Sequence, residues 1–189
     1  GSDTVSYAAD GAGVNVNLTT GTGVDGGGAT DTLSGFEGIV GSDFADTLTA
    51  STLGGTAIDA GAGADIVNGG DASDVLRGED GDDSVTSGAG IDQLFGGDGA
   101  DSLDGGAGND TVDGGAGADV LAGGDGADAL LGGAGNDFLV SGDGADTLDG
   151  GADTDAVAFT DLTASGVNAD LAAGLALDEF GNTDTLIGI

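Results

Sequence analysis

The amino-acid sequence lacks cysteine, histidine, proline, methionine and tryptophan, and its only cationic side chain is Arg77. Without cysteine the chain has no disulfide framework and no thiolate metal site. Without histidine it lacks the commonest general base and the commonest transition-metal ligand. One tyrosine and six phenylalanines among 189 residues argue against a core of large side chains. No run of about 18 apolar residues is present, so we expect no membrane insertion.

The charge of the chain is almost entirely of one sign. It has 35 acidic residues and a formal net charge of −34, which excludes nucleic acid and anionic membranes as partners. Two carboxylates about 5 Å apart repel by roughly 0.8 kcal/mol in water and by about 3 kcal/mol at an effective dielectric of 20. Over a dozen neighbours this repulsion exceeds the margin of about 5–15 kcal/mol that keeps a domain folded. We therefore expect either an unfolded chain or a fold that includes cations.

Most of the 44 glycines of the sequence belong to a nine-residue repeat. The unit is G-G-x-G-x-D-x-U-x, where U is Val or Leu in each of eleven consecutive copies. Glycine is missing four positions before the Asp only at Glu79, and two positions before it only at Ala72 and Asp153. The repeated acids are Asp65, Asp74, Asp83, Asp92, Asp101, Asp110, Asp119, Asp128, Asp137, Asp146 and Asp155.

Each repeat predicts a turn followed by a short strand. Glycine accepts positive φ and lets backbone carbonyl groups approach a ligand, so the first six residues are expected to form the turn. The last three, x-U-x, are expected to form a strand with U facing inward. Because one such strand cannot bury its own side chain, two repeats complete a coil of 18 residues, and the coils stack about 4.8 Å apart. The fold class expected is all-β, a parallel β-solenoid.

Coils of this length arrange the acids in two columns, one from Asp65 to Asp155 and the other from Asp74 to Asp146. Stacked carboxylates repel unless a divalent cation lies between them. Oxygen ligands without nitrogen or sulfur favour Ca²⁺ or Mg²⁺, and flexible turns favour the larger Ca²⁺. Five adjacent pairs in the first column and four in the second predict roughly nine ions.

Residues 60–159, with turns such as GGDGAD (96–101) and GGAGAD (114–119), resemble the RTX (repeats-in-toxin) β-roll family of secreted bacterial proteins. The resemblance implies a right-handed β-roll in which Asp side chains and turn carbonyls share each Ca²⁺ between stacked turns. Departures from the motif at Ala60, Ala72, Glu79 and Asp153 predict weak or missing sites there. Besides the eleven Asp residues, the implied ligands are the carbonyl groups of Gly96, Gly97, Gly99, Gly105, Gly106, Gly108, Gly114, Gly115, Gly117, Gly123, Gly124, Gly126, Gly132, Gly133 and Gly135.

The flanks of the regular array are less periodic. Residues 1–59 are expected to form an irregular N-terminal β-roll segment, in which Asp46 and Leu48 make a degenerate copy and Thr56 replaces the metal-binding Asp. Residues 60–159 form the regular calcium-binding roll. GVNVNLTTG and TDTLSGF near the beginning recur 153 positions later as GVNADLAAG and TDTLIGI. We therefore expect residues 160–189 to start a second copy of a larger module, in a fragment of a tandem-repeat protein.

Three functions fit these features. The first is a calcium-dependent structural module of a secreted or cell-surface bacterial protein, of adhesin or surface-layer type, with calcium ions and neighbouring modules as partners. The resemblance also implies type I secretion and folding outside the cell. The second is an accessory domain of a secreted protease, lipase or epimerase; the chain itself offers no catalytic His, Cys or Lys, and we expect no enzyme activity. The third, a ligand-binding surface, is disfavoured by mixed outward residues such as Ser84, Gln93 and Thr111.

Overall fold

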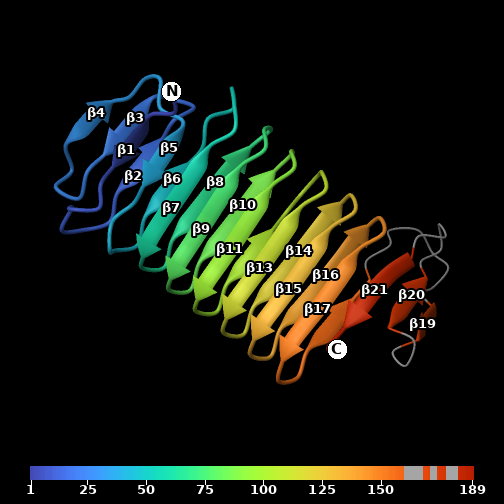
Figure 1. Ribbon diagram of the computed structural model, residues 1–189. Helices are drawn as coiled ribbons and strands as arrows, with labels where there is room; N and C mark the ends of the chain where they lie inside the picture. The colour runs from blue at the N-terminus through green and yellow to red at the C-terminus, as the bar shows by residue number, and fades with distance from the viewer. Residues whose placement is uncertain (160–167, 171–173, 178–182) are drawn as a thin grey trace.

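The computed structural model describes residues 1–159, 168–170, 174–177 and 183–189. These residues form strands joined by turns, and the strands stack in two sheets along one axis (Figure 1). Apart from the antiparallel strands at the two ends, all pairing is parallel, which confirms the predicted all-β parallel solenoid. Within the described ranges, no helix is long and apolar enough to span a membrane.

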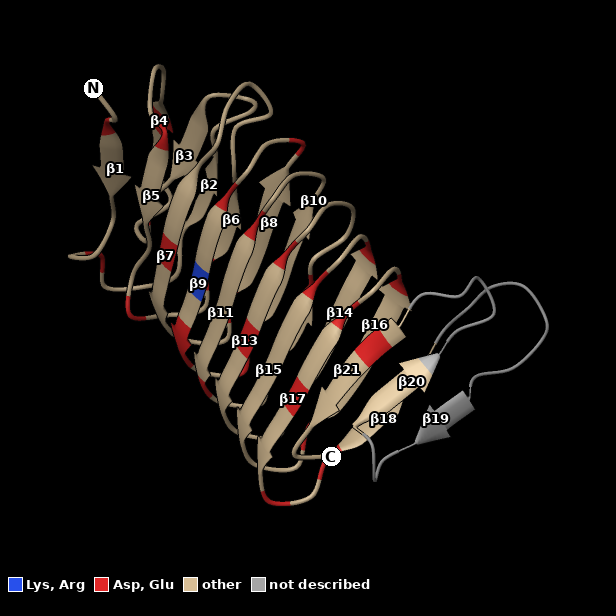
Figure 2. Cartoon of the chain, turned by 45° about the vertical axis from the view of Figure 1, so that its right-hand side comes forward, with Lys and Arg blue, Asp and Glu red and all other residues tan. Residues whose placement is uncertain are grey.

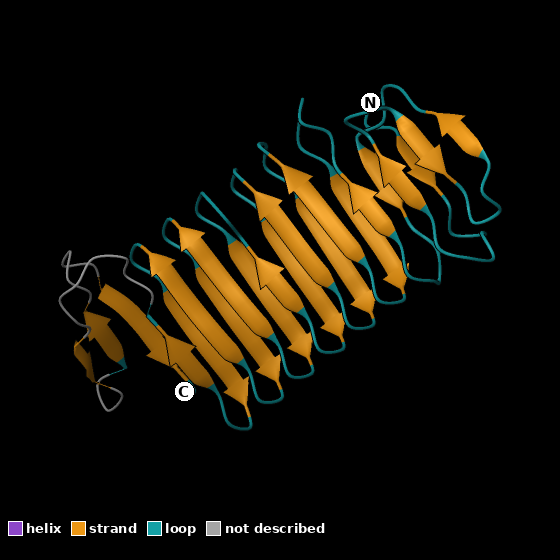
Figure 3. Ribbon diagram, turned by 180° about the vertical axis from the view of Figure 1, so that it is seen from behind, coloured by secondary structure: helices purple, strands orange, loops and turns teal. Residues whose placement is uncertain are grey.

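The chain alternates between the two sheets. The 11-stranded sheet contains, in spatial order, β1 (Thr4–Ser6), β5 (Gly38–Val40), β7 (Ala57–Ala62), β9 (Val75–Asp80), β11 (Gln93–Asp98), β13 (Thr111–Ala116), β15 (Ala129–Ala134), β17 (Thr147–Ala152), β21 (Thr183–Ile187), β20 (Leu175–Leu177) and β19 (Asn168–Asp170). The 10-stranded sheet contains β18 (Ala156–Ala158), β16 (Phe138–Asp143), β14 (Val120–Asp125), β12 (Ser102–Asp104), β10 (Ser84–Gly88), β8 (Ile66–Gly70), β6 (Thr47–Thr49), β2 (Asn15–Asn17), β3 (Thr22–Val24) and β4 (Thr30–Thr32). Figure 3 shows the same stack from behind.

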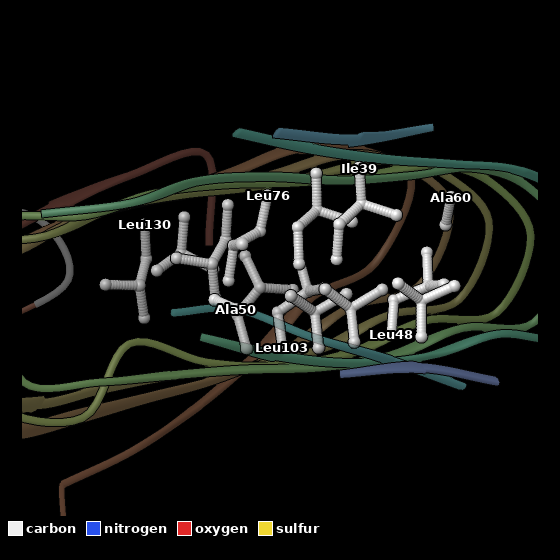
Figure 4. Packing of buried hydrophobic residues seen from close by; sticks show 14 of the residues in the cluster. Ile39, Leu48, Ala50, Ala60, Leu76, Leu103 and Leu130 are labelled. Atoms are coloured by element: carbon white, nitrogen blue, oxygen red, sulfur yellow. The ribbon is translucent and has the colours of Figure 1, made fainter. Parts of the chain in front are cut away.

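The register of the strands confirms the coil of 18 residues. Leu94 of β11 pairs with Val112 of β13, which pairs with Leu130 of β15. Aliphatic residues from both sheets meet in one thin layer, where Figure 4 shows Leu76, Leu103 and Leu130 between the sheets. From Val67 to Leu148 every U residue is at most 1% exposed. Each such burial contributes about 1.5–3 kcal/mol, so the core depends on many small equal layers.

Most strands of the regular roll have five or six residues, so the expectation of three-residue strands was wrong for them, whereas β12 and β18 have the expected three. β13 spans six residues, and its pairing with β11 continues through Gly97↔Gly115 and Asp98↔Ala116. The glycine pair has no side chains that could collide. Strand pairing therefore continues through residues that were expected to form a turn. Only three residues, G-x-D, remain outside the strands, as in Gly117 to Asp119.

The N-terminal flank continues the roll in degenerate form. Leu48 is fully buried and pairs with Val67 of β8, while Thr56 occupies the Asp position one coil before Asp74. At the other end, β21 adds to β17 with Leu186 opposite Leu148. Much of the expected second copy, residues 160–167, 171–173 and 178–182, lies outside the described residues.

Among the described residues, two non-glycine residues adopt positive φ: Glu79 in β9 with φ 75° and Asp153 in the turn after β17 with φ 80°. Both replace glycines of the repeat, and a residue with a Cβ is strained by about 1–2 kcal/mol in this conformation. We predict that Glu79→Gly raises the free energy of unfolding of the calcium-loaded chain by about 1 kcal/mol. Urea unfolding followed by circular dichroism measures this.

The neighbouring exposed strand residue, Asp80, has no positive φ and provides the control. Asp80→Gly removes the same kind of charge but should lower stability by roughly 0.5–1 kcal/mol, because glycine loses more entropy on folding. Equal effects of the two substitutions would show that charge, not backbone strain, decides the result.

Candidate metal centre

The repeated Asp residues lie where each three-residue turn leads into the next strand, and their side chains point into the roll. From Asp65 to Asp146 they are at most 3% exposed. Figure 2 shows acidic residues at successive turns along the roll, against the single basic segment on β9 that contains Arg77. The alternation that buries U also buries the Asp two residues before it, so the aliphatic core and the carboxylate column share one inward face.

One carboxylate oxygen of each Asp links successive coils. The backbone N–H of Asp83 donates to Oδ1 of Asp101 at 2.8 Å, and the N–H of Asp101 donates to Oδ1 of Asp119 at 2.8 Å. The second column repeats this bond, with Asp92 donating to Asp110 at 2.8 Å. The carboxylates are therefore held in two columns with a spacing of 18 residues.

The other oxygen, Oδ2, is buried without a hydrogen-bond partner. Leaving a buried acceptor unsatisfied costs about 1–3 kcal/mol, and more when the group is charged. A repeated penalty of this kind indicates a missing positive ligand. The oxygens in this state are Oδ2 of Asp65, Asp74, Asp83, Asp92, Asp101, Asp110, Asp119, Asp128, Asp137 and Asp155.

Glycine at the first repeat position makes room for this oxygen. A Cβ on Gly114 would lie 2.5 Å from Oδ2 of Asp119 and 2.7 Å from the carbonyl oxygen of Gly132 in the next coil. A side chain added to Gly114 would therefore displace both oxygens, whereas Ala60, Ser87 and Ser141 occupy the equivalent position in three other repeats. The space beside Oδ2 is therefore lined by a carboxylate oxygen and a backbone carbonyl oxygen, which are the ligands that Ca²⁺ prefers.

Glycines at the second and fourth positions bring further carbonyl groups close to the stack. Gly115 (φ +99) and Gly117 (φ +149) adopt positive φ, and a Cβ on either would overlap the carbonyl group of its equivalent in the preceding coil, Gly97 or Gly99. Among the described residues no three or more acidic side chains converge on one point. A cation in this roll would consequently need backbone carbonyls in addition to Asp.

The predicted glycines occupy these three environments. Those beside an Asp Oδ2 are Gly96, Gly105, Gly114, Gly123 and Gly132. Those with positive φ at the second position are Gly97, Gly106, Gly115, Gly124 and Gly133, and those at the fourth are Gly99, Gly108, Gly117, Gly126 and Gly135. All fifteen line the interior of stacked turns or face the carbonyl groups of a neighbouring coil.

Burial raises the pKa of eight column carboxyls, those of Asp65, Asp74, Asp83, Asp101, Asp110, Asp119, Asp128 and Asp137. It raises the pKa of Asp83 to about 7, and the charges of Asp65 and Asp101 add to the increase, against a lowering by the backbone N–H of Asp65. Burial likewise raises the pKa of Asp110 and of Asp119 to about 6. A carboxylate that resists ionisation without a partner is stabilised in its charged form by a nearby cation.

At the first position of each column, occupied by Asp46 or Thr56, the protein itself supplies the hydrogen bonds to the side chain. Asp46 Oδ1 accepts hydrogen bonds from Val14 N (2.7 Å) and Ser42 Oγ (2.8 Å), and its Oδ2 accepts one from Ser42 N (2.6 Å). Thr56 replaces the acid in the other column and accepts a bond from Ser51 N at 3.1 Å. The buried Oδ2 atoms without a hydrogen-bond partner therefore begin with the regular repeats, at Asp65 and Asp74.

The sequence did not predict one further buried Asp of the columns. Asp184 is 2% exposed, and its Oδ1 accepts a hydrogen bond of 3.0 Å from the backbone N–H of Asp146. It lies 38 residues after Asp146 instead of 18, so a search for the nine-residue period does not reach it. The signal available in the sequence was the D-x-U pattern of Asp184 and Leu186.

A parallel solenoid whose stacked turns present buried, oxygen-only positions is a calcium-binding β-roll. The family model of the RTX calcium-binding nonapeptide repeat matches the chain in four copies, at residues 59–94, 86–121, 95–130 and 122–157. The chain therefore belongs to this RTX family, whose repeats bind Ca²⁺. Comparison with curated protein sequences gives no match.

The raised pKa values predict that protonation of the column carboxylates at low pH stabilises the fold in part, as a bound cation would. The folded-state pKa of Asp83 is about 7 and that of Asp110 and Asp119 about 6, against an ordinary value of 3.8. Protonation therefore favours the folded state, fully below the ordinary pKa, and this contribution is lost as the pH rises through 6–7. In a calcium chelator, the circular dichroism signal of β-structure should be stronger at about pH 5 than at about pH 8.

With saturating Ca²⁺ the same comparison provides the control, because the cation stabilises the carboxylates at the higher pH. Equal β-structure at both pH values in chelator would contradict the assignment of burial as the cause of the shifts.

Proposed function

We propose that the eleven repeated Asp residues and the fifteen turn glycines hold Ca²⁺ between stacked turns, and that calcium binding folds the roll. The observation that carries this proposal is the column of buried Oδ2 atoms that lack partners. Seven of them lie beside a first-position glycine and a carbonyl oxygen of the next coil, as at Gly114, and they belong to Asp74, Asp83, Asp101, Asp110, Asp119, Asp128 and Asp137. The consecutive pairs along the two columns correspond to roughly nine ions, the number expected from the repeats.

Calcium-dependent folding follows from the energetics of the two carboxylate columns. Without cations, the chain would have to bury carboxylates that neither hydrogen bonds nor positive side chains neutralise, and Arg77 is its only cationic side chain. When no binding site exists in the unfolded state, the free energy of binding is free energy of folding. Extracellular calcium modules bind with dissociation constants of about 10⁻⁴–10⁻³ M, so calcium concentration outside cells would drive the transition.

The parent protein, in this proposal, is a secreted or cell-surface bacterial protein of adhesin or surface-layer type. Membership of the RTX family supports secretion, and the recurrence of the N-terminal segment after 153 positions supports a tandem array. A net charge of −34 would keep the chain expanded where calcium is scarce. The role of the module is structural: a roll that becomes rigid when it meets calcium.

A titration separates this function from that of a permanently folded roll. In chelator at neutral pH the chain should give a coil-like circular dichroism spectrum, and added Ca²⁺ should produce β-structure with a midpoint of about 10⁻⁴–10⁻³ M. Mg²⁺ at the same concentrations should leave the spectrum unchanged, because it demands octahedral geometry and keeps its waters. An equal β signal in chelator would contradict the proposal.

A pair of Asp→Asn variants tests the ligand assignment. Asp119 is buried in the column, whereas Asp104 is exposed on the outer face of β12. Asp119→Asn keeps the shape of the side chain but removes a charge, and it should destabilise the calcium-bound roll by about 1–3 kcal/mol, with a higher calcium midpoint. Asp104→Asn loses the same charge but should shift the midpoint much less, because Asp104 lies outside the column and acts on Asp110 only through its charge. Equal shifts for the two variants would show that only net charge matters.

A further inference from the structure

The chain contains one three-stranded antiparallel meander twice. The first copy is β2–β3–β4 and the second is β19–β20–β21, at opposite ends of the stack (Figure 1). The pair Thr22↔Thr32 recurs 153 positions later as Leu175↔Thr185. The hydrogen bond from Leu33 N to Gly21 O (2.8 Å) recurs with the same length from Leu186 N to Gly174 O. The two copies are the same structural element.

The strand before the meander is duplicated as well. Residues 3–7 (DTVSY, containing β1) correspond to residues 155–159 (DAVAF, containing β18). In the first copy a Cβ on Gly23 would overlap the hydroxyl group of Tyr7. At the corresponding positions of the second copy Phe159 has no hydroxyl group, and Ala176 supplies the Cβ. This exchange keeps the volume constant and indicates that both copies pack in the same way.

The two copies attach to the roll through opposite edges. In the first copy β2 pairs in parallel with β6, and β4 is the last strand of its sheet, with every residue exposed. In the second copy β21, the equivalent of β4, pairs in parallel with β17, and β19, the equivalent of β2, is the last strand. Each edge of the meander therefore has a partner in one of its two copies.

We propose that the exposed β4 edge is a docking surface for the last coil of a second copy of this module. The second meander shows the contacts: Thr32 would pair with Thr147 of the preceding copy, as Thr185 does here, and Asp31 would take the place of Asp184. Asp31, exposed in this chain, would accept the backbone N–H of Asp146 of the preceding copy. The β1 edge would pair with β16 of that copy, as β18 does here.

This junction joins consecutive rolls through both sheets, and it rests on the proposed calcium-driven folding of each roll. One face would run β17–β4–β3–β2–β6 and the other β16–β1–β5, with each strand named for its place in a module. The meander face thus gains two more strands than the opposite face, each about 4.8 Å wide. The axis of the array must bend away from the meander face at every junction.

Cysteine pairing tests the docking surface without background, because the chain has no cysteine. One chain carries Thr147→Cys together with Thr185→Pro, which removes the N–H that β21 donates to the Asp146 carbonyl (2.7 Å) and so releases the edge of β17. A second chain, distinguishable by mass, carries Thr32→Cys. Neighbouring strands bring Cα atoms within the range of about 4.4–6.8 Å that a disulfide requires. In Ca²⁺, mild oxidation should give several-fold more mixed dimer than the same pair without Thr185→Pro.

The control places the cysteine at Thr111, an exposed residue at the same repeat position whose strand has neighbours on both edges. Thr111→Cys with Thr185→Pro should give no more mixed dimer than the unreleased pair. Asp184→Ala provides a second way to release β21, and circular dichroism in Ca²⁺ verifies that each chain folds.

The two proposals fail in different ways. Calcium-folded chains that form no dimer specific to Thr147, or that react equally at Thr111, would overturn the junction alone. A parent chain that shows no calcium-induced β-structure would overturn the proposed function and the junction with it.

Discussion

The structure depends on one buried carboxylate per turn whose two oxygens have different partners. Oδ1 accepts the backbone N–H of the equivalent Asp in the preceding coil and so fixes the stacking, as between Asp83 and Asp101. Oδ2 of Asp119 faces Gly114 and a carbonyl oxygen of the next coil, and it is buried without a protein donor. The first oxygen holds the column together, and in the proposed function the second binds the cation. Because the same Asp does both, the proposal makes assembly of the coil and binding of calcium one event.

Glycine and the aliphatic residues follow from this constraint. A side chain on Gly114 would displace Oδ2 of Asp119, and side chains on Gly115 and Gly117 would meet a carbonyl group of the preceding coil. The core can be thin, because each coil contributes only two U residues such as Leu94 and Leu103, both almost completely buried. So little apolar burial per coil leaves the buried charge without an offset, and in the proposed function calcium ions supply that stabilisation.

The period of the sequence was sufficient to predict the solenoid, the inward U residues and the two columns, because every repeat makes the same local choice. It could not predict which oxygen of the Asp would be satisfied, because that depends on a backbone N–H one coil away. It also missed Asp184, which continues the column of Asp146 but is separated from it by a meander and not by two nonapeptide repeats. The satisfied state of Asp46 depends on Ser42 and Val14, and no motif marks those contacts. Strand length was misjudged because paired glycines can extend a ladder as well as break it.

The second meander continues the stacking of the roll, because β21 pairs with β17 and Asp184 accepts a hydrogen bond from Asp146 as the next Asp of the column. The account as a whole is tested most directly by a crystal structure grown in Ca²⁺, with anomalous scattering used to locate the metal. It predicts two rows of anomalous peaks within coordination distance of the Asp Oδ2 atoms, between successive turns. Oδ2 atoms that face ordered water alone, with no metal peak beside them, would contradict it.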